Sequence, residues 1–156
     1  MLDKYIWGDV SRISPEAPVQ VVHVLKETYA PGGASNVANN ASALNANAFM
    51  VGIAGNDEAK DILLDELKKR GINTDGIFID NEKPTIQKVR IVGRSQQLLR
   101  VDYEKKDHIH KDIEHSIIMF LERIIKYIDV IIISDYAKGV ITQWLSSNVI
   151  QLAKDY

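Results

Sequence analysis

The stretch that decides the fold is APGGASNVANNASALN, residues 30–45, in which two adjacent glycines precede a helical pattern. A helix that begins at glycines presents free N–H groups, and glycine lets a ligand approach the backbone closely. Asn36, one turn into this helix, offers both a donor and an acceptor. The stretch therefore predicts a corner that binds a polyhydroxylated ligand such as a sugar, or else a tight turn with a capping asparagine. The apolar face of the helix is mostly small, so it can sit close to a sheet: Ala34, Val37, Ala38, Ala41 and Leu44.

Composition narrows the class of protein. The chain has 156 residues, 46% hydrophobic and 26% charged, with a net charge of −2, which predicts one soluble globular domain. The absence of cysteine excludes disulfides and thiolate metal sites. Without a broad basic patch, nucleic acid is not an expected partner. The longest apolar run, Ile117–Leu121, is too short to span a membrane, and the first residues lack the apolar region of a secretory signal, so we expect a cytoplasmic protein.

Helical and strand-like segments alternate after Ala34, and this alternation predicts an α/β fold with a parallel sheet. Asn56 or Asp57 is expected to cap the second helix, and Thr142 the last one. The expected strands are 48–55 and 129–134, and the expected helices are 34–44, 56–71, 111–128 and 143–155.

Two β-rich pieces, residues 5–25 and 84–103, do not fit this alternation. The second piece reads as two strands around a turn at Gly93–Ser95. We expect the two pieces to pair as a small separate sheet.

Two charged stretches are candidates for ligand binding. SDYAKG, residues 134–139, places Asp135 and Lys138 three residues apart after an expected strand. Asp135 could hold a hydroxyl or a magnesium-bound water and Lys138 a phosphate, although a solvated loop with a local ion pair is nearly as good an interpretation. In the β-rich stretch 88–100, strand alternation places Lys88 and Arg90 on one face, which could meet a phosphorylated substrate or could simply be a charged strand edge that resists aggregation. No zinc-binding histidine pattern, serine-hydrolase elbow or P-loop motif is present.

Taken together, these motifs resemble the ribokinase-like (PfkB) carbohydrate kinases. More narrowly, the chain resembles the D-glycero-β-D-manno-heptose 7-phosphate kinase domain of the bifunctional ADP-heptose synthesis proteins, N-terminal part only. SRISPEAPV and QQLLRVDYE are the stretches most specific to the heptose kinases. The motifs that carry the resemblance occur in the family's order: MLDKYIWG, SRISPEAPVQVV, PGGASNVANN, VGIAGND, KVRIVGRSQQLLRVDYE and SDYAKG.

The resemblance implies a ribokinase-like three-layer α/β fold, truncated, with residues 1–156 forming a partial PfkB-type kinase domain. The pieces near 5–25 and 84–103 are then a small β-sheet lid that closes over the sugar and forms a homodimer. The implied reaction is the ATP-dependent phosphorylation, with Mg²⁺, of heptose 7-phosphate at O-1, a step towards ADP-heptose and the lipopolysaccharide core.

The resemblance also implies roles for individual residues. Asp3 and Asn36, with the backbone at Gly32 and Gly33, are expected to hold sugar hydroxyls. The remaining residues that match motif positions are expected to contact substrate with roles left open: Lys88, Arg100, Asp135 and Lys138.

The chain departs from the family pattern in its second half. The family's catalytic base lies in a G-A-G-D motif, whereas the last glycine of this chain is Gly139 and the only acid after it is Asp155. We therefore expect sugar contacts without a catalytic residue, an ATP site or a metal site, and no kinase activity of the chain alone. Two alternatives remain open: a fragment of a ribose-type or fructose-type sugar kinase, and a non-catalytic sugar-binding or dimerisation module.

Overall fold

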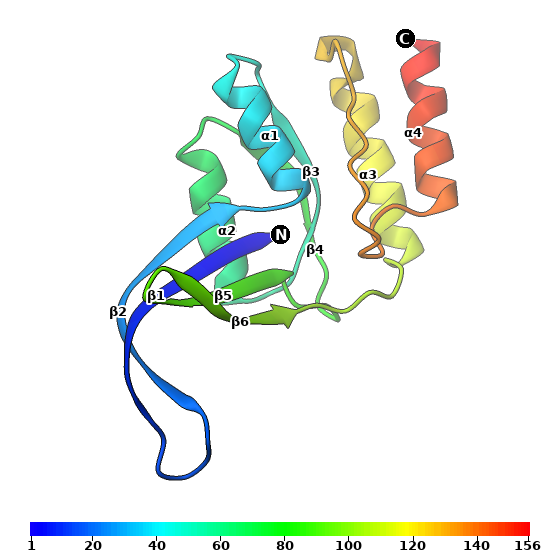
Figure 1. Ribbon diagram of the computed structural model, residues 1–156. Helices are drawn as coiled ribbons and strands as arrows, with labels where there is room; N and C mark the ends of the chain where they lie inside the picture. Colours follow the sequence, from blue (N-terminus) through cyan, green and yellow to red (C-terminus); the bar gives the residue numbers. More distant parts are fainter.

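Residues 1–156, in a computed structural model, form six strands and four α-helices arranged around two separate sheets (Figure 1). This architecture confirms the predicted α/β class with a separate small sheet. The strands are β1 (Leu2–Ile13), β2 (Gln20–Pro31), β3 (Phe49–Ala54), β4 (Asn73–Ile79), β5 (Gln87–Gly93) and β6 (Gln96–Tyr103). The helices are α1 (Ala34–Ala43), α2 (Glu58–Lys68), α3 (Lys111–Ile124) and α4 (Gln143–Asp155), and a short 3₁₀ turn, η1 (Ile125–Tyr127), continues α3.

Strands β3 and β4 pair in parallel and form the middle of three layers. Successive side chains of a strand point to opposite faces. Met50 and Ile77 accordingly pack against the cluster that contains the buried leucines of α2, whereas Val51 and Phe78 pack against the cluster of α3 and α4. Figure 1 shows the two strands between α1 and α2 on one side and α3 and α4 on the other.

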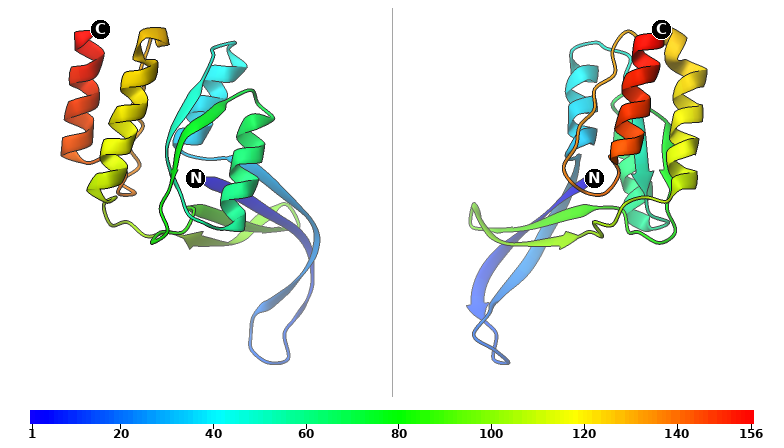
Figure 2. Two further views of the ribbon diagram at one scale, coloured as in Figure 1. Left: turned by 180° about the vertical axis from the view of Figure 1, so that it is seen from behind. Right: turned by 90° about the vertical axis from the view of Figure 1, so that its right-hand side faces the viewer.

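The other four strands form one sheet in the order β2-β1-β5-β6. The hairpins β1–β2 and β5–β6 are antiparallel, and β1 joins them by pairing in parallel with β5 from Leu2 to Gly8. The two β-rich pieces therefore pair as predicted. Figure 2 shows the far end of the β1–β2 hairpin projecting well away from the helices. The predicted turn is centred on Arg94 and Ser95, whose φ angles of 49° and 67° match the two-residue turns that fit strand twist.

Side-chain caps start two of the helices where the sequence predicted them. Asp57 Oδ1 accepts a hydrogen bond of 2.9 Å from the Lys60 N–H at the start of α2. Thr142 Oγ1 accepts one of 3.0 Å from the Leu145 N–H at the start of α4. Both contacts satisfy donors that a helix otherwise leaves free.

The prediction of a buried strand over residues 129–134 is wrong. This segment follows η1 but joins neither sheet, and Val130 and Ile132 are 73% and 62% exposed. The apolar pattern is that of a strand, but a strand also needs a neighbouring strand to complete its hydrogen bonds, and no strand pairs with this segment. No helix in the structure combines the length and apolar character needed to cross a membrane.

Candidate functional site

The glycine pair lies where β2 ends and α1 begins. Gly33 is the residue before α1, has φ of 54° and gives the helix no side-chain cap. A Cβ at Gly32 would lie 2.5 Å from Asp3 Oδ2, and a Cβ at Gly33 would lie 2.6 Å from Met1 Cε. The first turn of α1 therefore begins next to a carboxylate and has the positive dipole end of a helix without a side-chain cap, while the Ser35 and Asn36 N–H groups donate to the carbonyls of Gly32 and Gly33.

Asp3 sits between this corner and the four-stranded sheet. Its backbone lies in β1, next to Lys88 of β5 in the parallel register. Asp3 Oδ1 accepts a hydrogen bond of 2.7 Å from Arg90 Nη1, and both side chains are about four-fifths buried. This hydrogen bond raises the pKa of Arg90 further above its usual value, so the guanidinium stays charged. Asp3 is thus a fixed carboxylate with one oxygen on Arg90 and the other facing Gly32.

Lys88 and Arg100, which the sequence placed on adjoining strands, meet through a residue that sequence reasoning missed. Lys88 Nζ lies 3.0 Å from Asp102 Oδ2, and Arg100 Nε lies 2.8 Å from Asp102 Oδ1. The hydrogen bond from Lys88, together with that from Arg100, lowers the pKa of Asp102 despite some burial. Alternation in LRVDY places Arg100 and Asp102 on one strand face, and this signal could have identified the pair.

Aromatic side chains extend the same face of the sheet. The rings of Tyr5 and Trp7 stack with centroids 5.9 Å apart. The Arg90 guanidinium lies 5.2 Å from the Tyr5 centroid, and Lys26 Nζ lies 5.5 Å from that of Trp7. Trp7 Nε1 also donates to Thr28 Oγ1 at 2.9 Å. This face therefore combines cations, aromatic rings and fixed polar groups, which suits a polar anionic ligand.

The loop 134–139 reaches the glycine pair through an aromatic side chain. Tyr136 Cδ2 lies 3.6 Å from the position that a Cβ at Gly33 would occupy. Asp135 is exposed, and its Oδ1 accepts a hydrogen bond of 2.7 Å from the Ala137 N–H, so it closes a local turn. Lys138 Nζ donates to Glu104 Oε2, beyond the end of β6, and this bond is the main cause of the lowered pKa of Glu104.

The structure thus brings Asp3, Gly32 and Gly33 into direct proximity and places Lys88 and Arg100 on the strands next to them. Asn36 is exposed in the first turn of α1. Asp135 and Lys138 belong to the adjoining loop, where each already has a partner within the chain.

The family model of the pfkB family carbohydrate kinases matches residues 4–148. The chain belongs to this family.

Curated relatives are similar in sequence to this pfkB chain over nearly its whole length. It is 44% identical over 154 residues to the "Bifunctional protein HldE" of Desulfatibacillum aliphaticivorans, and 46% identical to that of Helicobacter hepaticus. Each match covers 99% of this chain but 32% of the relative, so the chain spans about a third of the length of these proteins.

Solved structures share the fold. A phosphofructokinase structure from Staphylococcus aureus, described as putative, superimposes with a TM-score of 0.68 and 12% identity, over 99% of this chain and 47% of the other. The tetrameric inhibited form of phosphofructokinase-2 from Escherichia coli gives a TM-score of 0.66 and 16% identity, over 99% and 48%. These matches confirm the ribokinase-like fold that the sequence resemblance implied.

The pfkB family implies ATP and a divalent metal, but the side chains of this chain do not form a site for the metal. No group of three or more histidine, aspartate and glutamate side chains is placed to hold a metal ion. No step of the chemistry is therefore assigned to a metal or to ATP on these residues.

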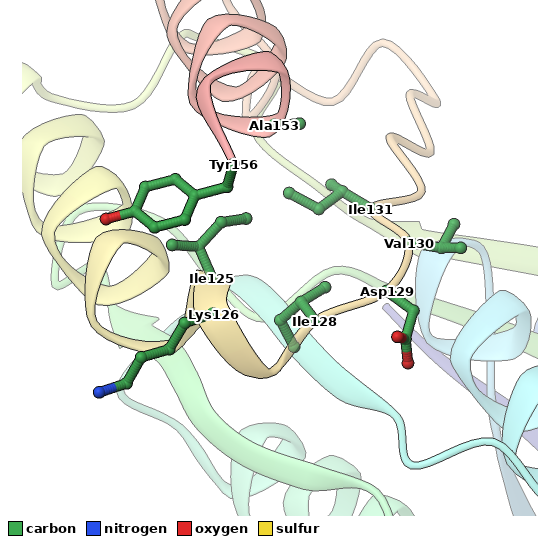
Figure 3. A pocket seen from close by; sticks show the side chains of 8 residues that line it. All are labelled: Ile125, Lys126, Ile128, Asp129, Val130, Ile131, Ala153 and Tyr156. Carbon is green, nitrogen blue, oxygen red and sulfur yellow. The ribbon is translucent and has the colours of Figure 1, made fainter.

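Figure 3 shows a hollow of about 370 Å³. One side is formed by η1 and the residues directly after it, and the other side by the end of α4. Six of its eight lining residues are hydrophobic, and Figure 3 shows its charged side chains, Lys126 and Asp129, pointing away from each other. The hollow lacks converging polar groups, so we do not regard it as the sugar site.

Proposed function

We propose that this chain forms the sugar-binding part of a D-glycero-β-D-manno-heptose 7-phosphate kinase. The observation that carries the proposal is the identity of 44–46% to HldE proteins over 99% of the chain. In the proposed reaction, ATP with Mg²⁺ phosphorylates O-1 of the heptose 7-phosphate in the cytoplasm, on the route to ADP-heptose and the lipopolysaccharide core.

The proposed sugar contacts lie around the glycine pair. The Asp3 carboxylate and the Asn36 amide take sugar hydroxyls, and the backbone at Gly32 and Gly33 approaches the ring closely because no Cβ intervenes. The geometry that supports this assignment is the contact between Asp3 and Gly32, which places an acceptor beside an uncapped helix start.

The proposed phosphate contacts lie on the four-stranded sheet. Lys88 and Arg100 are both held by Asp102, so two cations are already ordered on one face before a ligand arrives. Asp135 and Lys138 would line the same site from the loop 134–139. We propose that residues 5–25 and 84–103 act as the lid over the sugar and that two chains form a homodimer through it.

Phosphoryl transfer needs a base for the attacking hydroxyl and a site for ATP, and neither is assigned to these 156 residues. The proposal for the chain alone is therefore binding of the sugar phosphate without turnover, within a domain of which 1–156 is part.

The test is calorimetric titration of the chain with heptose 7-phosphate, with ribose 5-phosphate and fructose 6-phosphate as comparison ligands. We expect the heptose 7-phosphate to bind most tightly and Asp3→Asn to weaken it. Tighter binding of either comparison ligand favours the ribose-type or fructose-type alternative, and binding of none of the three contradicts the proposal.

A non-catalytic assembly module is the second candidate function, and the exposed apolar segment 129–134 is the observation that favours it. Sedimentation with and without heptose 7-phosphate separates the two candidates. A pure assembly module associates equally in both conditions and binds no sugar.

A further inference from the structure

Arg90, which the sequence only placed on a charged face with Lys88, makes a direct side-chain hydrogen bond to the proposed sugar-binding carboxylate. Its Nη1 donates to Asp3 Oδ1 at 2.7 Å, although 87 residues separate the two in the chain. The side chains of Arg90 and Asp3 are 21% and 18% exposed. The contact is therefore well shielded, and it joins β5 to β1 within one sheet.

Two features fix the direction in which Arg90 presents its N–H groups. Its guanidinium lies over the Tyr5 ring, at 5.2 Å from the centroid, and Tyr5 in turn stacks on Trp7. A guanidinium held over a ring by a cation–π contact presents its donors in one rigid plane, which a flexible ammonium group does not do.

The two oxygens of Asp3 consequently face different partners. Oδ1 is held by Arg90, while Oδ2 lies 2.5 Å from the point where a Cβ at Gly32 would stand. Holding one oxygen prevents the carboxylate from turning about its own axis, so the other oxygen stays directed at the corner where α1 begins. A preorganised acceptor binds a hydroxyl more tightly than one that must be ordered first.

We propose that Arg90 is a positioning residue, which holds the Asp3 carboxylate in the orientation that accepts a sugar hydroxyl. The inference rests on the proposed function of the same corner. Arg90 and Lys88 both belong to β5, which pairs with β1. Sugar affinity should therefore depend on the position of β5 relative to β1.

The experiment is a double-mutant cycle on heptose 7-phosphate affinity, measured by calorimetry on the 156-residue chain. The variants are Arg90→Met, Arg90→Lys, Asp3→Asn and the double variant Arg90→Met with Asp3→Asn. Arg94→Met is the matched control, because Arg94 lies in the β5–β6 turn with its side chain 73% exposed. Thermal unfolding of each variant identifies any that fails to fold.

We expect Arg90→Met to weaken binding about tenfold and to have almost no further effect once Asp3 is Asn, because the two residues act as one unit. Arg90→Lys is expected to recover part of the affinity, since lysine restores one charged donor but not the planar set of donors of a guanidinium. Arg94→Met is expected to bind like the unmutated chain.

Two results would overturn the inference alone. One is unchanged affinity in Arg90→Met. The other is an equal loss from Arg90→Met with and without the Asp3 carboxylate, which would mean that Arg90 only stabilises the sheet. If the unmutated chain binds no sugar phosphate, the proposed function fails, and this inference fails with it.

Discussion

The backbone N–H of Thr85 donates to Asp57 Oδ2 at 2.8 Å, and the Thr85 hydroxyl accepts from the Gly55 N–H at 2.9 Å. Thr85 is buried and precedes β5, whereas Gly55 and Asp57 lie between β3 and α2. These two hydrogen bonds connect the end of β3, in the two-stranded sheet, to the residues just before β5, in the four-stranded sheet. They define the junction across which the two sheets are joined.

Replacing Thr85 with Val leaves the Gly55 N–H without its acceptor in a buried place. We expect the free energy of unfolding to fall by about 1–3 kcal/mol, the usual cost of a buried unsatisfied donor. Urea unfolding followed by circular dichroism measures the change. Thr74→Val on β4 makes the same exchange of atoms away from the junction, and an equal loss there would contradict the assignment.

Asp57 should make stability depend on acid pH. Burial by itself raises the pKa of this carboxyl, but the hydrogen bonds from Thr85 and Lys60 outweigh burial and lower the pKa below its ordinary 3.8. A carboxyl with a lowered pKa in the folded state stabilises the protein at pH values above 3.8, and this stabilisation is lost as pH falls through the folded-state pKa. Unfolding midpoints measured between pH 6 and pH 3 should fall less steeply in Asp57→Asn than in the unmutated chain.

His110 should titrate above its ordinary range. Its Nε2 lies 3.0 Å from Glu82 Oε2, and this hydrogen bond raises the pKa of His110 above 6.5 while lowering that of Glu82. The ion pair therefore stabilises the fold at pH values below 6.5 and ceases to do so as pH rises through the raised pKa. An NMR titration should show the midpoint of His110 moving down in Glu82→Gln; an unmoved midpoint would refute the pairing.

The ion pair between Glu104 and Lys138 should hold the loop 134–139 in place. Removing the charge in Glu104→Gln frees Lys138 and is expected to speed amide hydrogen exchange in residues 135–139, because the loop loses its contact beyond β6. Mass spectrometry of the exchanged peptides measures the rate. Glu122→Gln on the exposed side of α3 is the control and should leave those peptides unchanged.

The glycine pair should not tolerate a side chain. Gly33→Ala forces alanine to φ of 54° with ψ of −129°, which costs about 1–3 kcal/mol, and Gly32→Ala places a methyl group on the Asp3 carboxylate. We expect lower unfolding midpoints for both variants and loss of sugar binding for Gly32→Ala. Sugar affinity in Gly32→Ala equal to that of the unmutated chain would show that Asp3 and the corner act independently.

The chain alone should not turn over ATP with heptose 7-phosphate. A coupled assay that follows ADP release measures this, with a longer pfkB heptose kinase as the positive control. Turnover comparable to that control would mean that residues within 1–156 supply a base and an ATP site.

The sequence by itself determined most of the local structure. Caps at Asp57 and Thr142, the turn at Arg94 and Ser95, and the helix start at the glycine pair depend on neighbours within a few residues, so their patterns are visible along the chain. The family motifs likewise pointed to Asp3, Gly32 and Gly33, which the structure brings into direct proximity.

Tertiary structure alone decided the partners of those residues. Arg90 reaches Asp3 across 87 positions, and Lys138 reaches Glu104 across 34, because sheet register and loop packing place them together. The segment 129–134 shows that local sequence alone does not make a strand. Its apolar residues favour a strand, but a strand forms only where a second strand completes its hydrogen bonds. A few neighbouring residues encode local structural propensity. The partners of a strand or side chain depend on which distant segments the whole fold places next to it.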